Sequence, residues 1–185
     1  MKENSKRFSI FLLLALMLVG LDQFTKQLAV EHLMGAERVP IIRNVLYLLY
    51  IENRGAAFGS LQGAQVFFYI ITVVVLCGIV YVVHRIPQGD RHFLPLLLVC
   101  ELIFSGAIGN FIDRVRQQYV VDFIYFSPID FPVFNVADIY VTVGCALMVV
   151  LFLFYYRMRS SVSCIVLRSA ETHEQGKRNR NRAGV

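Results

Sequence analysis

The sequence predicts an all-α integral membrane protein, with four transmembrane helices and a small β-containing loop between the first two. Three observations predict this fold. The 185-residue chain is 57% hydrophobic. Only 17% of its residues are charged, whereas roughly a quarter is usual in a soluble domain. Its apolar residues also fall in blocks that are long enough to cross a bilayer. The length favours one domain, with no room for a separate soluble module.

Four apolar stretches give the expected spans, at about 8–30, 66–83, 93–112 and 136–156. Each can cross a hydrocarbon core of about 30 Å, the first only if its polar end is included. A cleavable signal peptide is the competing interpretation of the first stretch, because basic residues precede it. The helical pattern continues through Asp22 and Lys26, however, and no small-x-small cleavage site follows the apolar run. These features favour a retained span.

The distribution of basic residues predicts the orientation. Lysines and arginines lie before the first span, between the second and third spans, and after the fourth. Short loops with this excess usually face the cytoplasm. We therefore expect both termini to be cytoplasmic, and the loops 31–63 and 113–135 to be extracytoplasmic. Within the first loop, Arg38–Ile51 has the pattern of short extended segments separated by a turn, which predicts a small sheet on the outer membrane surface.

The expected domain division is a membrane domain at 1–159 and a basic cytoplasmic tail at 160–185. The tail is polar and lacks periodicity, so we expect it to be disordered and to lie near anionic lipid. Nucleic-acid binding is the alternative function of its basic residues, but a basic stretch after the last span already fits the positive-inside rule. The cysteines and histidines show no metal-ligand spacing, and the sequence predicts neither a metal nor a cofactor.

Several polar residues are predicted near the outer edge of the membrane, where ionisable groups are costly within the bilayer and are candidates for function. Asp22 and Lys26 are four residues apart and share one helix face. Asn53 and Gly55 follow the expected sheet, where small residues allow close backbone approach. A third group falls within an arc of roughly 100° on the third span, so all its members could face one partner. This group consists of Asn110, Asp113 and Arg114.

Asp122 and Asp138 are the candidate catalytic pair. Asp122 lies in an apolar stretch, Tyr119–Phe126, and Asp138 lies three residues after Asn135 at the expected start of the fourth span. A surface loop and a helix cap would explain these two carboxyl groups individually. If they converge, they share a proton. One can then act as general base on water while the other protonates or polarises a carbonyl group, so that peptide hydrolysis needs no metal.

The polar residues also fall into motif blocks that resemble those of the lipoprotein signal peptidases (signal peptidase II). The blocks keep the family's order from Gly20 to about Ile139, and the helices extend the likeness to about Tyr156. They are Asp22-Gln23 with Lys26, Asn53-Arg54-Gly55-Ala56-Ala57-Phe58, Gly109-Asn110-Phe111-Ile112-Asp113-Arg114, Val121-Asp122-Phe123 and Phe134-Asn135-Val136-Ala137-Asp138.

The resemblance implies an aspartic endopeptidase of the bacterial cytoplasmic (inner) membrane, with its active site at the extracytoplasmic face. It would remove signal peptides from diacylglyceryl-modified prolipoproteins, cleaving on the N-terminal side of the lipid-modified cysteine. It also implies membrane lipid and the cyclic peptide inhibitor globomycin as partners, and nothing in the motifs requires more than a monomer. Asp122 and Asp138 would be the catalytic dyad. The site-supporting residues would be Asp22, Lys26, Asn53, Gly55, Asn110, Asp113, Arg114, Asn135 and Ala137.

Two features depart from the family pattern. Ser105-Gly106 stands where the family often has Gly-Gly, and we expect little effect from so small a side chain. Glu101 lies within the third span, on the helix face opposite Asn110, and is not expected to join the dyad. Two other functional classes stay open at this point. One is a proton-coupled transporter or channel with Asp22, Glu101 and Asp138 as relay carboxylates, and the other is a non-catalytic assembly factor.

Overall fold

The computed structural model describes residues 2–55, 64–86 and 91–156. Its long helices are α1 (Lys2–Leu33), α2 (Gln65–Arg85), α3 (Leu94–Gln117) and α4 (Val136–Val150), and a π-helical segment, Leu151–Tyr156, continues α4. Within the described residues, four helical stretches are long and apolar enough to cross a membrane: Lys6–Leu33, Gln65–Arg85, Leu94–Gln117 and Val136–Tyr155. This result confirms the four expected spans, by length and composition.

The end of α3 differs from the prediction. The sequence placed it near residue 112, where the apolar run stops, but the helix continues to Gln117. Gln118 then adopts a left-handed conformation (φ 65°) and donates its backbone N–H to the carbonyl oxygen of Arg114, which ends the helix. The polar residue Asp113 does not end it, because its buried carboxylate has partners on neighbouring elements.

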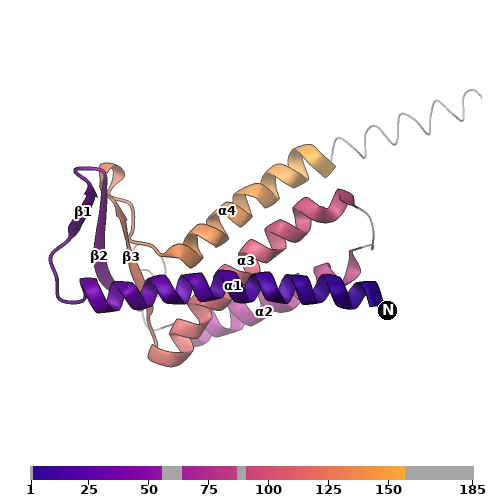
Figure 1. The fold of residues 1–185 in the computed structure, drawn as a ribbon, viewed down its shortest axis with the longest axis horizontal. Helices are drawn as coiled ribbons and strands as arrows, with labels where there is room; N and C mark the ends of the chain where they lie inside the picture. Colours follow the sequence, from indigo (N-terminus) through magenta and orange to yellow (C-terminus); the bar gives the residue numbers. More distant parts are fainter. Residues whose placement is uncertain (1, 56–63, 87–90, 157–185) are drawn as a thin grey trace, which may run out of the picture. The chain divides into compact units, whose positions relative to one another are not determined.

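A three-stranded antiparallel sheet lies at the end of α1 that is distant from the N-terminus (Figure 1). Its order is β1 (Val39–Ile42), β2 (Leu46–Asn53) and β3 (Val120–Phe126). The first two strands confirm the predicted extended segments, and Asn44 forms the turn between them with φ 60°. The sequence did not predict β3. The sheet therefore combines strands from two connections, between α1 and α2 and between α3 and α4.

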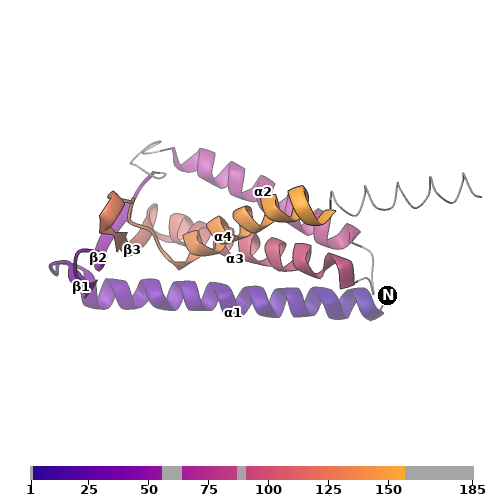
Figure 2. The same cartoon turned by 90° about the horizontal axis from the view of Figure 1, so that it is seen from above.

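Helix α3 lies between α1 and α2 in the part of the chain up to Cys145, which forms one compact unit (Figure 2). Phe11, Ile79, Val83 and Cys100 form an apolar core among these helices. At the N-terminal end of α1, the Arg7 guanidinium donates to the carbonyl oxygens of Val83 and Ile86 at 2.9 and 3.0 Å. Positive charge at a helix C-terminus is favourable, and these bonds satisfy carbonyl groups of the last turn of α2.

The first turns of α4 pack closely against α3 and α1. A Cβ atom at Gly106 would collide with the carbonyl oxygen of Ala137, and one at Gly109 would lie 2.5 Å from Asp22 Oδ2. Small residues are therefore required on this face of α3, as at many helix contacts within membranes. The second compact unit is 146–185, of which the structure describes 146–156. The expected tail at 160–185 lies outside the described residues, and the orientation of the termini stays a prediction.

Candidate active site

Strand β3 determines where Asp122 points. Side chains alternate between the two faces of a strand. Val121 and Phe123 pack with Ala29 and Leu33 of α1 in an apolar cluster. Asp122 therefore faces away from that cluster, although only 2% of the residue is exposed. Pairing of Ile51 with Asp122 and of Asn53 with Val120 places the end of β2 beside it.

The chain returns to Asp122 through an isolated bridge between Ile124 and Phe134. The Phe134 carbonyl oxygen accepts hydrogen bonds from the N–H groups of Phe123 and Ile124, and Phe134 N–H donates to the carbonyl of Ile124. Asn135, immediately after this bridge, precedes the first residue of α4, and Asp138 lies in the first turn. The two aspartates therefore converge, as the sequence predicted.

Each carboxylate oxygen of the pair accepts a hydrogen bond from a different N–H group. Asp122 Oδ1 accepts from Asn135 Nδ2 at 2.6 Å, and Asp122 Oδ2 accepts from Asn53 Nδ2 at 2.8 Å. Asp138 Oδ1 accepts from Asn110 Nδ2 at 2.7 Å, and Asp138 Oδ2 accepts from the backbone N–H of Asn135 at 3.1 Å. Asn135 thus contacts both aspartates, and three asparagines orient the pair.

A buried ionic cluster supports this arrangement from α1. Lys26 Nζ lies 2.9 Å from Asp22 Oδ2 and 2.9 Å from Asp113 Oδ2, and donates to Asn110 Oδ1 at 2.9 Å. Asp22 Oδ1 accepts from the backbone N–H of Ala137 at 2.9 Å, which ties α1 to the start of α4. Asp113 Oδ2 also accepts from Val121 N–H at 3.3 Å, so the cluster holds β3 as well.

Gln23 also belongs to this cluster, although it was not among the site residues predicted from the sequence. Its Nε2 donates to Asp113 Oδ1 at 2.8 Å and to the Gly109 carbonyl oxygen at 3.2 Å. Its position beside Asp22 in the first motif block was the available signal. An uncharged amide next to a buried carboxylate can satisfy polar groups on a neighbouring helix.

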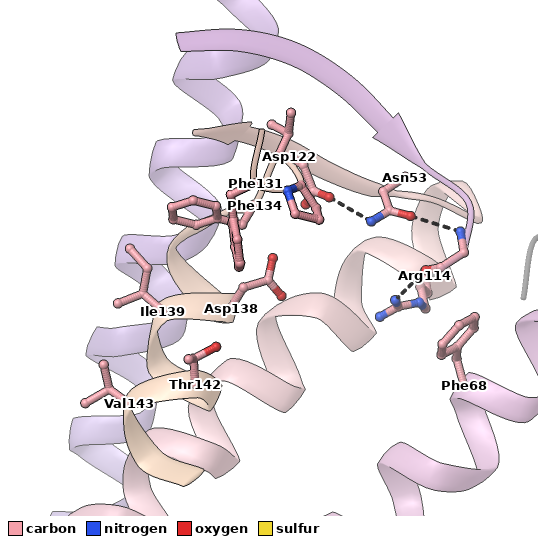
Figure 3. Close-up of a pocket in the computed structure, with 13 residues that line it drawn as sticks. Asn53, Phe68, Arg114, Asp122, Phe131, Phe134, Asp138, Ile139, Thr142 and Val143 are labelled. Carbon is pink, nitrogen blue, oxygen red and sulfur yellow. Dashed lines mark hydrogen bonds between the residues drawn. The ribbon is translucent and has the colours of Figure 1, made fainter. Parts of the chain in front are cut away.

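Both aspartates line a pocket of about 450 Å³ (Figure 3). Arg114 also lines it and lies 4.4 Å from the centre of the Phe68 ring, with Nη2 3.4 Å from the Gly55 carbonyl oxygen. Arg114 departs from the expectation that it would face one partner together with Asn110 and Asp113. Those two residues contact Lys26, whereas the Arg114 guanidinium faces the pocket. Gly55 is held by its own N–H, which donates to Asn53 Oδ1 at 3.0 Å.

The apolar wall of the pocket was not identified from the sequence. Its residues come from α2, the segment before α4, and one face of α4, where 139, 142 and 143 have helical spacing. Apolar residues in spans look alike in a sequence, so only the fold distinguishes pocket-lining positions from lipid-facing ones. The wall consists of Phe68, Phe131, Pro132, Val133, Phe134, Ile139, Thr142 and Val143.

The electrostatic surroundings raise the pKa of Asp122 to about 7, first through burial and then through the nearby charge of Asp138. Hydrogen bonds from Asn53 and Asn135 and the charge of Lys26 lower it, but do not cancel the increase. A carboxyl group with such a pKa holds its proton near neutral pH. That behaviour is expected of one member of a pair that shares a proton.

The structure also bears on the expectations for Glu101, for the second motif block and for metal binding. Glu101 is buried in α3 and accepts a hydrogen bond from Ser105 Oγ at 3.3 Å, and it does not line the pocket. Ala56–Phe58 of the second motif block lie outside the described residues. Within the ranges that the structure describes, no three His, Cys, Asp or Glu side chains are grouped as a metal site would require. A metal-free mechanism stays a prediction.

Four membrane-length helices with a paired-carboxyl pocket at one end define a multi-pass membrane protein with an enzyme-like site. Residues 14–154 match the family model described as "Signal peptidase (SPase) II". The chain therefore belongs to the signal peptidase II family of bacterial membrane proteins, and this membership indicates a peptidase.

Individual relatives agree with the family match. A lipoprotein signal peptidase of Anoxybacillus flavithermus is 46% identical over 141 residues, which are 75% of this chain and 82% of that protein. One of Caldanaerobacter subterraneus is 47% identical over 137 residues, 74% of this chain and 90% of that protein. A solved structure described as a bacterial membrane enzyme, at 1.9 Å resolution, superposes with a TM-score of 0.70 at 36% identity, covering 79% of this chain and 94% of the other.

Proposed function

We propose that this protein is an aspartic endopeptidase that removes signal peptides from diacylglyceryl-modified prolipoproteins, cutting on the N-terminal side of the lipid-modified cysteine. Asp122 and Asp138 are its catalytic residues. The observation that carries the proposal is their convergence: both line one pocket, and Asn135 donates a hydrogen bond to each. The relatives described as lipoprotein signal peptidases support the choice of substrate.

In the proposed reaction, the pair begins with one proton. The ionised carboxylate removes a proton from a water molecule, whose oxygen attacks the scissile carbonyl carbon. The protonated carboxyl group gives its proton to the carbonyl oxygen, and a neutral tetrahedral intermediate forms. Collapse of the intermediate breaks the C–N bond: the carboxyl group that took the water proton gives it to the leaving nitrogen, and the other carboxylate takes a hydroxyl proton from the intermediate, which restores the singly protonated pair. The raised pKa of Asp122 supports this scheme, since it keeps a proton on the pair near neutral pH.

The pocket wall supports an apolar peptide as substrate. Ile139 and Val143 on α4, with Phe68 on α2, present apolar surface next to the aspartates. A signal peptide is apolar, and within the bilayer its side chains would be held here by van der Waals packing against this wall, because lipid tails are as apolar as the pocket and supply no hydrophobic driving force. The aspartates lie at the sheet end of the helices, so the cleaved bond would lie at the membrane surface and the signal helix would extend along α4.

The orientation is part of the proposal. The sheet and the aspartates would face the extracytoplasmic side of the inner membrane, and both termini would be cytoplasmic. Arg7 and Arg85, at the opposite end of α1 and α2 from the sheet, support this assignment through the positive-inside rule. Membrane lipid and globomycin would bind the same protein, which would work as a monomer.

Cysteines introduced at Asn44 and at position 88, in a background without the native cysteines, would test the orientation with a membrane-impermeant maleimide on intact cells. Only the first should react.

The decisive experiment uses the purified protein in detergent with a diacylglyceryl-modified prolipoprotein. Asp122→Asn and Asp138→Asn should each abolish cleavage, and globomycin should inhibit the unmodified enzyme. Asp130→Asn is the matched control, because Asp130 bonds Tyr125 OH at 2.6 Å and does not line the pocket. Cleavage that survives substitution of either member of the pair would remove the assignment of the dyad. Loss of activity with a metal chelator would indicate a different class of hydrolase.

A further inference from the structure

The three asparagines around the aspartates must each present the correct end of the side-chain amide. An amide has a donor end and an acceptor end, and it reverses them when it rotates by half a turn. Asn53, Asn110 and Asn135 all direct Nδ2 to a carboxylate oxygen. A reversed amide would place its carbonyl oxygen against that carboxylate. The hydrogen bonds to the aspartates therefore depend on what holds each Oδ1.

Backbone groups hold two of the three amides. Asn53 Oδ1 accepts from the N–H of Gly55 at 3.0 Å, and Asn135 Oδ1 accepts from the N–H of Asp138 at 3.0 Å. Asn110 is different. Its Oδ1 accepts from Lys26 Nζ at 2.9 Å and, at the longer distance of 3.2 Å, from Asn135 Nδ2. At Asn110, the ammonium group of Lys26 on α1 therefore takes the place of the backbone N–H that holds Oδ1 in Asn53 and Asn135.

Lys26 is well placed for this role. Its ammonium has three N–H donors, and three acceptors surround it at 2.9 Å: Asp22 Oδ2, Asp113 Oδ2 and Asn110 Oδ1. Only 3% of the residue is exposed. The two carboxylates are themselves bonded, Asp22 to Ala137 N–H and Asp113 to Gln23 and Val121. Nζ is thus held from several elements, and its remaining donor is directed at Asn110.

We propose that Lys26 is a positioning residue that holds the Asn110 amide with its donor end toward Asp138, whichever protonation state Asp138 adopts. The inference rests on the proposed function, since it assigns Lys26 a role in the same aspartate pair. An ionised Asp138 attracts an N–H group without help. A protonated Asp138 can instead donate to an amide oxygen, so the carboxyl group alone does not fix the amide during a reaction in which it gains and loses a proton. Lys26 opposes the reversed amide in both states, because that amide would direct N–H groups at the ammonium.

A double-mutant cycle tests this role, with kcat and KM measured for cleavage of the lipid-modified substrate. Lys26→Met and Asn110→Leu should each lower kcat by roughly tenfold or more with little change in KM, as expected for an interaction that matters in the transition state. If Lys26 acts through Asn110, adding Lys26→Met to Asn110→Leu should lower kcat by less than about twofold further. Losses that multiply in the double variant would overturn the proposal.

Gln23→Leu is the matched control within the ionic cluster, since Gln23 bonds Asp113 and the Gly109 carbonyl. It should lower the thermal unfolding midpoint, and its effect on kcat should multiply with that of Asn110→Leu. If Lys26→Met does not fold, Asp113→Asn is added to it, because this pair of changes leaves the net charge of the cluster unchanged. The effect of Asn110→Leu on kcat is then measured with and without the pair. If the effect of Lys26→Met on kcat also multiplied with that of Asn110→Leu, Lys26 would have a structural role alone, and the proposal would be contradicted.

The dyad variants separate the two proposals. Inactive Asp122→Asn and Asp138→Asn proteins, combined with multiplying losses for Lys26 and Asn110, would refute the positioning role and leave the proposed function in place. Active dyad variants would refute the proposed function. The positioning role would then be refuted as well, whatever the result of the double-mutant cycle, because there would be no catalytic aspartate pair for Lys26 to support.

Discussion

Asn135 and Asp138 cap each other at the start of α4: Asp138 N–H donates to Asn135 Oδ1 at 3.0 Å, and Asn135 N–H donates to Asp138 Oδ2 at 3.1 Å. This reciprocal arrangement is a capping box with aspartate in place of glutamate. Asn135 also donates through Nδ2 to Asp122 Oδ1 at 2.6 Å. The residue that starts the helix therefore joins the two aspartates, and the helix-cap and catalytic interpretations of Asp138 are compatible.

Substitution of Asn135 should separate its two roles. Asn135→Ser keeps an oxygen that can accept from Asp138 N–H, but loses the amide donor to Asp122. We expect the helix cap to be kept, because serine is as good an N-cap as asparagine, so the loss of stability should be limited to about 1–3 kcal/mol from the buried carboxyl group that loses its donor. Cleavage should fall by about tenfold or more, because one oxygen of a buried carboxylate is left without a donor. Circular dichroism melts and kcat on the lipid-modified substrate measure the two effects.

Asn135→Ala is the companion variant. It removes the cap as well as the donor, and should cost about 1 kcal/mol of additional stability while reducing kcat no more than Asn135→Ser does. If the serine variant cleaved normally, the amide bond to Asp122 would have no part in the reaction.

The raised pKa of Asp122 predicts how activity depends on pH. With a pKa of about 7, against 3.8 for an ordinary aspartate, the buried pair should keep its shared proton below neutral pH and lose it above. We expect kcat/KM to fall as pH rises through about 7, with a second decrease at low pH where both carboxyl groups are protonated. The measurement is a pH–rate profile from about pH 5 to about pH 9. A profile that is level through pH 7 would contradict the assignment.

The free energy of unfolding should also change with the titration of Asp122, and the raised pKa determines the direction of that change. The folded protein binds the Asp122 proton more tightly than the unfolded chain, so this contribution to stability is complete below pH 3.8 and is lost as pH rises through about 7. Asp122→Asn removes the titrating group. Its unfolding midpoint should therefore decrease less than that of the unmodified protein between about pH 5 and about pH 8.

The sequence could predict the four spans, because each is a run of apolar residues with a length set by the bilayer. It could also predict the convergence of Asp122 and Asp138, since ionisable residues in apolar stretches need an explanation. It did not predict β3. Ser127-Pro128 ends the apolar segment Tyr119–Phe126. No local pattern identifies the partner of this segment, however, because its pairing with β2 joins residues far apart in the chain.

The supporting residues were found less completely than the aspartates. Arg114 shares an arc of α3 with Asn110 and Asp113, but a long side chain can leave that arc, and its guanidinium lies over the Phe68 ring. Gln23 is uncharged, so no argument from buried charge selects it. Both outcomes depend on which helices pack against α3. The periodicity of one helix does not determine its neighbours.

Gly109 should be essential for packing near the site. A Cβ at this position would lie 2.5 Å from Asp22 Oδ2 and 3.2 Å from Ala137 Cβ. Gly109→Ala should therefore displace Asp22 from Ala137 N–H and cost about 1–3 kcal/mol, as overpacking usually does. It should also reduce cleavage, because Ala137 lies beside Asp138. Gly78→Ala is the control, since nothing lies within 4 Å of its Cβ. In an exposed helix position that change should be neutral or stabilising, and equal effects at 78 and 109 would contradict the packing argument.

Glu101 provides a test between a peptidase and a proton-coupled transporter. It is 5% exposed, its Oε1 accepts from Ser105 Oγ, and its Oε2 has no hydrogen-bond partner among the described residues. A relay would need this carboxyl group, whereas the proposed peptidase does not. We expect Glu101→Gln to cleave within about twofold of the unmodified rate, because Glu101 does not line the pocket. Its unfolding midpoint should be unchanged or higher, since an ionisable group is costly within a span.

Ser105→Ala is the informative partner of Glu101→Gln. It leaves the carboxyl group in place but removes the hydroxyl group that donates to it, Ser105 Oγ at 3.3 Å. The serine variant should therefore be less stable by about 1–3 kcal/mol, the usual cost of a buried polar group that loses its partner. Cleavage at temperatures well below the unfolding midpoint should be unaffected in both variants. Loss of cleavage in Glu101→Gln, with stability intact, would place Glu101 in the reaction and favour a relay of carboxyl groups along α3.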